Sequence, residues 1–178
     1  MTERAGIYGG SLYDLAKEEN LSDSIMEQLE DVKQLFRENP DYIRLLSEPA
    51  IKREERIKLI DDAFKDGEQY LRNFLKLLCE KGLLGEFEGC VSAYKKRYYA
   101  DNNIAEALVT SAVKLSPEQL SALREQIAKK CGKKVILSDK LDPGVLAGIK
   151  VEVDGRLYDG TVAGRLERMD KTLSEIIM

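Results

Sequence analysis

The sequence predicts two domains of different fold class, α followed by α/β. Residues 1–102 are expected to form an N-terminal six-helix bundle, and residues 103–178 a small α/β domain with a short mixed sheet. Three observations support this division. As far as residue 100, apolar side chains recur every three to four positions, which is the period of amphipathic helices. From residue 103, apolar and polar residues alternate, as in half-buried strands. The pair Asp154-Gly155 separates two alternating stretches and is a strong signal for a β-hairpin.

The first helix is expected over residues 4–19. Five residues fall on one face of this helix: Tyr8, Ser11, Leu12, Leu15 and Ala16. Gly9 and Gly10 lie inside this helix, where each costs about 1 kcal/mol relative to alanine. Two explanations stay open, namely the close approach of another backbone or a frayed first turn.

Caps and breakers bound the next helices of the bundle. Ser22 or Ser24 is expected to cap the second helix, and Asn39-Pro40 to stop it. Gly67 should close the fourth helix. Gly82 should close the fifth helix from the position after its C-cap, where glycine is favoured. Short connections between the six helices indicate a compact bundle.

The fifth helix carries more apolar surface than one contact stripe needs. Two rows lie side by side on it: Leu71, Leu75 and Leu78, and next to them Tyr70, Phe74 and Leu77. A wide apolar stripe is consistent with a central helix that is buried on two sides. Alternatively, the second row lines an exposed groove for the amphipathic helix of a partner.

The second domain is expected to have the order strand, helix, strand, hairpin, helix. Its first strand spans residues 103–113. Residues 116–119, Ser-Pro-Glu-Gln, are a complete helix start with a serine cap, proline at the first position and glutamine in the capping-box position. Gly132 should end this helix. Residues 135–137 are expected to form a short buried strand, and Thr161 to cap a final helix.

The hairpin leaves a question of register. A two-residue turn at Asp154-Gly155 would pair the two valines of the preceding strand with Arg156 and Tyr158. It would also put Leu157 on the opposite face from those valines. Either both faces of the sheet are partly covered, or the loop is longer and a bulge resets the phase.

The composition excludes several classes of protein. The chain has 178 residues, a formal net charge of −4 and 34% charged residues, as expected of a charge-rich globular protein. It contains no apolar run of membrane-spanning length and no signal peptide. Histidine is absent, which removes the commonest general base and metal ligand. The scattered cysteines Cys79, Cys90 and Cys131 indicate reduced thiols and no disulfide framework or zinc site.

Charge clusters suggest two binding hypotheses. Residues 11–31 hold seven carboxylates and one lysine, which is either a solvated helical face or an acidic surface for a basic partner. Two basic clusters, Tyr94–Tyr99 and Lys129–Lys134, would suit a nucleic-acid-binding module, because aromatic rings stack on bases and cations meet phosphates. Against this, Tyr94 and Tyr98 fall on the core face of their helix, and the net charge is negative.

The sequence contains no catalytic constellation. Neither a phosphate-binding P-loop nor a dinucleotide-binding glycine motif is found. We therefore expect no catalytic residue, no bound cofactor and no metal. The residues by themselves indicate an adaptor or a structural subunit.

Several motifs follow the order of one known family. The less specific ones are residues 8–16, 49–56, 73–78, 81–84, 109–112 and 115–119. The most specific one runs from Asp142-Pro143 to Ile149 and is followed by Asp159-Gly160-Thr161 and Arg165-Leu166. With these motifs, nearly the whole chain resembles the delta subunit of bacterial F-type ATP synthases, whose mitochondrial relative is the oligomycin sensitivity-conferring protein. Gly9-Gly10-Ser11 departs from it, because the family is usually alanine-rich there.

The resemblance implies a non-catalytic subunit of the peripheral stalk, which resists rotational torque during proton- or sodium-driven ATP synthesis. The helical domain would bind the N-terminal helices of the alpha subunits of the catalytic head. Their groove would lie between the first and fifth helices, at positions that correspond to Tyr8, Ser11, Phe74 and Leu77. The α/β domain would hold the C-terminal end of the b subunits. The protein would lie on the cytoplasmic face of the bacterial membrane, attached only through the complex, and would bind no nucleic acid.

Overall fold

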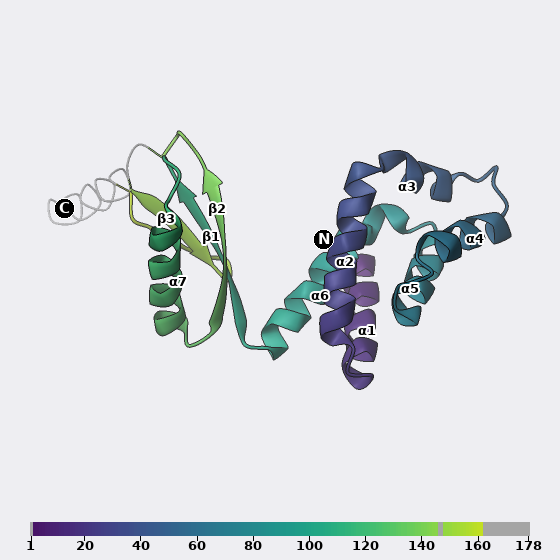
Figure 1. Cartoon of the computed structure of the whole chain (residues 1–178), viewed down its shortest axis with the longest axis horizontal. Coiled ribbons are helices and arrows are strands. Elements are labelled where there is room, and N and C mark those ends of the chain that lie inside the picture. The colour runs from purple at the N-terminus through teal and green to yellow at the C-terminus, as the bar shows by residue number, and fades with distance from the viewer. Residues whose placement is uncertain (1, 146–147, 162–178) are drawn as a thin grey trace, which may run out of the picture. The chain divides into compact units, whose positions relative to one another are not determined.

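A computed structural model describes residues 2–145 and 148–161 of the chain (Figure 1). The chain divides into two compact units, Met1–Tyr98 and Tyr99–Met178. The described residues form seven α-helices, one 3-10 helix and a mixed four-stranded sheet, which confirms the predicted class of α followed by α/β. None of the described helices is both long and apolar enough to cross a membrane. The helix expected after Thr161 lies outside the described residues.

Helices alone make up the N-terminal unit. Along the chain they are α1 (Glu3–Glu18), α2 (Ser22–Glu38), α3 (Pro40–Ser47), α4 (Arg53–Ala63), α5 (Gln69–Glu80), the 3-10 helix η1 (Leu84–Glu86) and α6 (Phe87–Asp101). Their buried side chains form one hydrophobic core. The ring of Phe36 belongs to this core and contacts the rings of Phe87 and Phe64 edge-on. Each fully buried side chain of this size contributes about 1.5–3 kcal/mol, so this core is what holds the helices together.

The contact between α1 and α6 explains the glycines of the first helix. A β-carbon on Gly9 would lie 2.2 Å from the carbonyl oxygen of Cys90, and one on Gly89 would lie 2.8 Å from the β-carbon of Ala5. Real β-carbons do not approach other atoms so closely, so the two helices meet where each lacks a side chain. Close approach of another backbone, and not a frayed turn, therefore accounts for Gly9.

The predicted end of α5 is confirmed. Gly82 has a φ of 66°, and the amide of Leu83 donates to the carbonyl of Leu78 at 2.8 Å. The amide of Gly82 donates to the carbonyl of Cys79. This pair of hydrogen bonds is the Schellman motif, which satisfies two carbonyls at the helix end.

Two other predicted helix boundaries are wrong. α2 has no side-chain cap, because Ser22 is its first helical residue and the Ser24 hydroxyl donates to Glu68 of another segment. α4 ends at Ala63, with Phe64 as its C-cap, and so stops short of Gly67. In both cases a contact made by the folded unit replaced the local signal: Phe64 turns out of the helix to reach Phe36.

The second unit is a sheet with one helix on it. The strands β1 (Ile104–Ser111), β2 (Lys134–Leu141), β3 (Ile149–Val153) and β4 (Arg156–Asp159) are arranged in the order β2-β1-β3-β4. β1 is parallel to β2 and antiparallel to β3. α7 (Pro117–Cys131) connects the two parallel strands and covers one face of the sheet (Figure 1). Its Ile127 is buried with Ala107, Val109 and Val151.

The ends of α7 form as predicted. The Ser116 hydroxyl accepts a hydrogen bond from the amide of Gln119, and the Gln119 side chain accepts one from the amide of Ser116. This is the complete capping box. Gly132 ends the helix with a φ of 67°.

The prediction of a short buried strand at residues 135–137 is wrong. β2 has eight residues, alternates between partly covered and exposed, and lies at the edge of the sheet. Ile136 is 43% exposed because it points to the face that α7 does not cover. Three consecutive apolar residues therefore mark only the covered centre of a longer edge strand.

The register question at the hairpin has a clear answer. Val153 pairs with Arg156 and Val151 with Tyr158, so the turn has two residues. Asp154 and Gly155 both have positive φ, at 47° and 79°, which matches the twist of a two-residue hairpin. Leu157 consequently lies on the opposite face and is 63% exposed.

Candidate functional site

α1 and α5 lie side by side in opposite directions. At one end, the Thr2 hydroxyl, which also caps α1, donates a hydrogen bond to the carboxylate of Glu86, shortly after α5 ends. At the other end, the Glu19 carboxylate lies beside the hydroxyl of Tyr70 in the first turn of α5. Burial, together with that carboxylate, raises the pKa of Tyr70. The start of α1 therefore lies beside η1, which follows α5 and contacts it, and the end of α1 lies beside the start of α5.

The four predicted groove residues lie on these two helices at different depths. Phe74 is 6% exposed and belongs to the core, so most of its ring is unavailable to a partner. Tyr8 is half-buried and packs against the core. Leu77 is 37% exposed, and Ser11 is exposed. The four therefore lie on two helices that contact each other, three of them at least partly accessible and Phe74 buried.

Two further apolar residues of α1 are exposed, besides the four predicted groove residues. Leu15, which the sequence places on one face with Leu12 and Ala16, is 37% exposed, and Ile7 is 60% exposed. The buried row of α1 consists of Ala5, Gly9, Leu12 and Ala16. At 100° per residue, Leu15 falls on the flank of that row, together with Tyr8 and Ser11. A helical-wheel reading that starts from the buried glycine would have found this flank.

The opposite flank of α1 is occupied by α6. Arg97 of α6 donates to both carboxylate oxygens of Asp14, at 2.5 and 2.6 Å, and to the carbonyl of Gly10 at 3.3 Å. The ring of Tyr13 meets that of Tyr94 edge-on at 5.3 Å. These contacts leave Leu15 exposed on the flank toward α5, whereas Ile7 falls on the outer face of α1 next to Asp14.

Ion pairs also hold α5, and they come from α4. Lys76 pairs with Asp61 of α4 at 2.5 Å, and Arg53 of α4 pairs with Glu80 at 2.6 Å. Exposed pairs of this kind contribute little energy but fix orientation. We call the remaining surface the α1/α5 strip, and it consists of Tyr8, Ser11, Leu15, Tyr70, Phe74 and Leu77.

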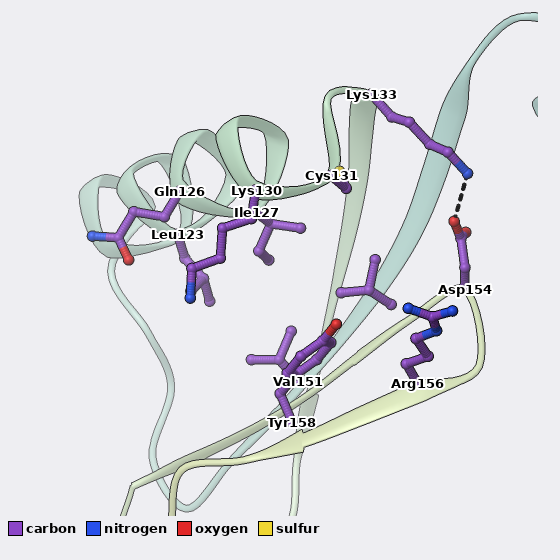
Figure 2. A pocket seen from close by; sticks show the side chains of 11 residues that line it. Leu123, Gln126, Ile127, Lys130, Cys131, Lys133, Val151, Asp154, Arg156 and Tyr158 are labelled. Carbon is purple, nitrogen blue, oxygen red and sulfur yellow. Dashed lines mark hydrogen bonds and ion pairs between the residues drawn. The ribbon is translucent and has the colours of Figure 1, made fainter.

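The C-terminal unit contains a separate cavity of about 560 Å³ between α7 and the β3–β4 hairpin (Figure 2). Its lining is mixed: Leu123, Ile127 and Val151 are apolar, and Lys130 and Arg156 are among its charged side chains. Lys133 at its edge pairs with Asp154 of the hairpin turn at 2.8 Å. Figure 2 shows Tyr158 beside Val151, on the sheet side of the cavity.

The two buried cysteines of the N-terminal unit are not reactive groups. Burial raises the pKa of the Cys79 thiol and raises that of Cys90 to about 11, so both thiols stay protonated at neutral pH and are poor nucleophiles. Among residues 2–145 and 148–161, no group of three or more histidine, cysteine or acidic side chains could hold a metal ion.

Comparison with known proteins identifies the family. A family model described as the ATP synthase delta (OSCP) subunit matches residues 5–173. The chain belongs to this family. The ATP synthase subunit delta of Lactobacillus johnsonii is 32% identical over 174 residues, which cover 97% of this chain and 96% of that protein. The corresponding protein of Clostridioides difficile is 30% identical over 175 residues, with 97% of both chains covered.

The delta-family fold is also seen in solved structures. A chain of the mitochondrial ATP synthase hexamer of Toxoplasma gondii aligns with a TM-score of 0.79 over 97% of this chain and 98% of its own length, at 17% sequence identity. A chain of the Polytomella F-ATP synthase aligns with a TM-score of 0.52 over 57% of this chain and 90% of its own length, at 20% identity. At these identities the likeness concerns the fold.

As a member of the delta (OSCP) family, the protein is a non-catalytic subunit of ATP synthase, as the resemblance implied. The nucleic-acid hypothesis finds no support. Within the first basic cluster, Arg97 pairs with Asp14 and Lys95 lies 3.9 Å from Glu30. In the second, Lys129 and Lys130 lie in the last turn of α7, where positive charge is favoured. Both clusters therefore have structural explanations.

Proposed function

We propose that this delta-family protein links the catalytic head of a bacterial F-type ATP synthase to its peripheral stalk, on the cytoplasmic face of the membrane. The N-terminal unit binds the N-terminal helices of the alpha subunits through the α1/α5 strip. The C-terminal unit holds the C-terminal end of the b subunits. The protein then acts mechanically, because it keeps the head from turning with the central shaft.

One observation supports this role for the N-terminal unit above others. Leu15 and Leu77, on two helices that run side by side, keep more than a third of their surface exposed. Half-buried Tyr8 and Tyr70 flank them. An amphipathic helix inserts apolar residues at three- and four-residue spacing into surfaces of this kind. Such a helix would cover the strip along its length.

The strip also rests on a rigid base, which a torque-bearing link needs. α1 is locked to α6 through Gly9 and through the Arg97–Asp14 pair, and α5 is tied to α4. Load on a bound helix would therefore pass directly into the core of the N-terminal unit. Stiffness and affinity suffice for this function.

Calorimetric titration of the full chain with the N-terminal helix peptide of its own organism's alpha subunit tests the proposal. We expect saturable one-to-one binding. Leu77→Asp should weaken it by about thirtyfold or more, since a charge would have to be buried against the apolar face of the peptide. Phe74→Asp is unsuitable, because Phe74 is part of the core and its loss would unfold the unit.

A matched control comes from α3. Leu45 is 41% exposed on that helix, which packs against α2, α4 and η1. Leu45→Asp adds the same charge at similar exposure and should leave the affinity unchanged. Equal binding by the wild type and Leu77→Asp would remove the strip from the proposal, and no binding by the folded wild type would remove the role itself.

The second interface is tested with the soluble part of the b subunits. The full chain should bind it, and Leu77→Asp should bind it equally well, because the proposal assigns the two partners to different units. Loss of both interactions in this one variant would contradict that assignment.

A further inference from the structure

The α1/α5 strip is apolar along its middle and charged at both ends. On α1, residues at a spacing of three or four form one stripe: Arg4, Tyr8, Ser11, Leu15 and Glu18. On α5 the matching stripe is Tyr70, Phe74, Leu77 and Lys81. The apolar residues of α1 lie between Arg4 and Glu18, and those of α5 precede Lys81; all three charged residues are exposed.

The antiparallel arrangement puts charges of the same sign together. Thr2 contacts Glu86 of η1, which follows α5 and contacts it, so Arg4 and Lys81 mark the same end of the strip. Glu19 lies beside Tyr70, so Glu18 and Glu19 mark the other end. Arg4 and Glu18 are 14 residues apart along α1, which corresponds to about 21 Å.

We infer that the strip selects the direction of the helix it binds by charge: the acidic half of the partner helix lies over Arg4 and Lys81, and its basic half lies over Glu18 and Glu19. This inference rests on the proposed function and adds to it the charge pattern of the occupant. Other charges close to the ends do not reverse the pattern. Glu86 is engaged by Thr2 and Glu80 by Arg53, and Glu3 is turned about 100° from Arg4 around α1.

The expected preference for one direction of the bound helix is modest but measurable. Exposed ion pairs are weak one by one, yet reversing a helix on the strip converts attraction into repulsion at both ends. We expect a ratio of about tenfold between the two directions at low salt, which corresponds to about 1.4 kcal/mol. The ratio should fall toward one as salt screens these exposed charges.

Two peptides test the inference on the isotope-labelled full chain. Both keep the apolar row of the alpha N-terminal helix; one has an acidic first half and a basic second half, and in the other these charges are exchanged. Each carries a nitroxide at its N-terminus, which broadens nearby amide signals. The first peptide should broaden signals at Arg4 and Lys81, and the second those at Glu18 and Tyr70. The helix dipole acts identically in both peptides, so the exchange isolates the side-chain charges.

The variant Arg4→Glu, Lys81→Glu makes both ends acidic. With it, the first peptide should lose its preference and broaden signals at both ends. Broadening at the same end by both peptides, or an unchanged pattern in the variant, would overturn the directional inference while leaving helix binding intact. Failure of both peptides and of the natural alpha helix to bind would instead refute the proposed function.

Discussion

The carbonyl oxygen of Cys90 lies 2.2 Å from the place where Gly9 would carry a β-carbon. Both residues are buried, and they join α1 to α6 along the flank opposite the α1/α5 strip. Because α1 is pressed against α6 at this point, its other flank is left to face α5 and the solvent. The position of the strip therefore depends on a glycine that takes no part in it.

Replacement of Gly9 by alanine tests this packing. The added methyl group overlaps a backbone atom that cannot rotate away, so we expect a loss of about 2–3 kcal/mol of unfolding free energy, in spite of alanine's better helix propensity. Urea denaturation followed by circular dichroism measures it. Gly10→Ala is the control, because its β-carbon would meet only the flexible end of Arg97, at 3.0 Å, and should change stability by less than about 1 kcal/mol. A Gly9→Ala protein as stable as the wild type would contradict the close contact.

A side chain at Gly155 should destabilise the hairpin turn. Its φ of 79° lies in the left-handed region, and nothing within 4 Å would obstruct a β-carbon, so any cost is conformational. We expect Gly155→Ala to destabilise the protein by about 1 kcal/mol. Gly85→Ala, at an equally open position without a positive φ, should cost less. The two midpoints of urea denaturation provide the comparison, and equal midpoints would argue against the two-residue turn.

The capping box of α7 should be worth about 1 kcal/mol. Ser116→Ala removes the acceptor for the amide of Gln119, and that amide then has no partner within the helix. Ser121→Ala, on an exposed position within the same helix, should be neutral or slightly stabilising. Hydrogen exchange of the first-turn amides of α7 should accelerate only in Ser116→Ala. Identical exchange in both variants would show that the cap is not formed.

The buried thiol of Cys90 predicts a loss of stability in alkali. Its pKa is raised from 9.0 to about 11 by burial, so between these values the unfolded chain releases the proton and the folded chain keeps it. Rising pH then favours unfolding by about 1.4 kcal/mol per pH unit, and no effect is expected below pH 9. Denaturation curves from pH 8 to 11 should show this fall, and Cys90→Ala should reduce its slope. The same slope in the variant would assign the fall to other groups, such as Tyr94, whose pKa burial also raises.

The same burial predicts which thiol reacts first. Cys131 is partly exposed at the end of α7, whereas Cys79 and Cys90 are buried. Under native conditions at pH 8, iodoacetamide should therefore modify Cys131 well before the other two, as peptide mass spectrometry would show. In urea all three should react at similar rates. Early modification of Cys90 in the native protein would contradict the packing of α1 on α6.

Features that depend on neighbouring residues were predictable from the sequence. The capping box at Ser116, the glycine after α5 at Gly82 and the turn at Asp154-Gly155 all form as expected. Each depends on backbone angles and hydrogen bonds within a few residues, and the residue types themselves dictate these. The alternation along β1 was equally informative, because one face of a central strand must be buried against α7.

The tertiary structure decided which helix covers which face. Periodicity showed that Leu15 shares a helix with Leu12, but only the approach of α6 at Gly9 turns Leu12 inward and leaves Leu15 exposed. In the same way, Phe74 is buried and Leu77 is accessible, although the sequence placed them in one row. A repeat of 3.6 residues determines which side chains share a face; whether that face meets a core, a partner or water depends on neighbours that are distant in sequence.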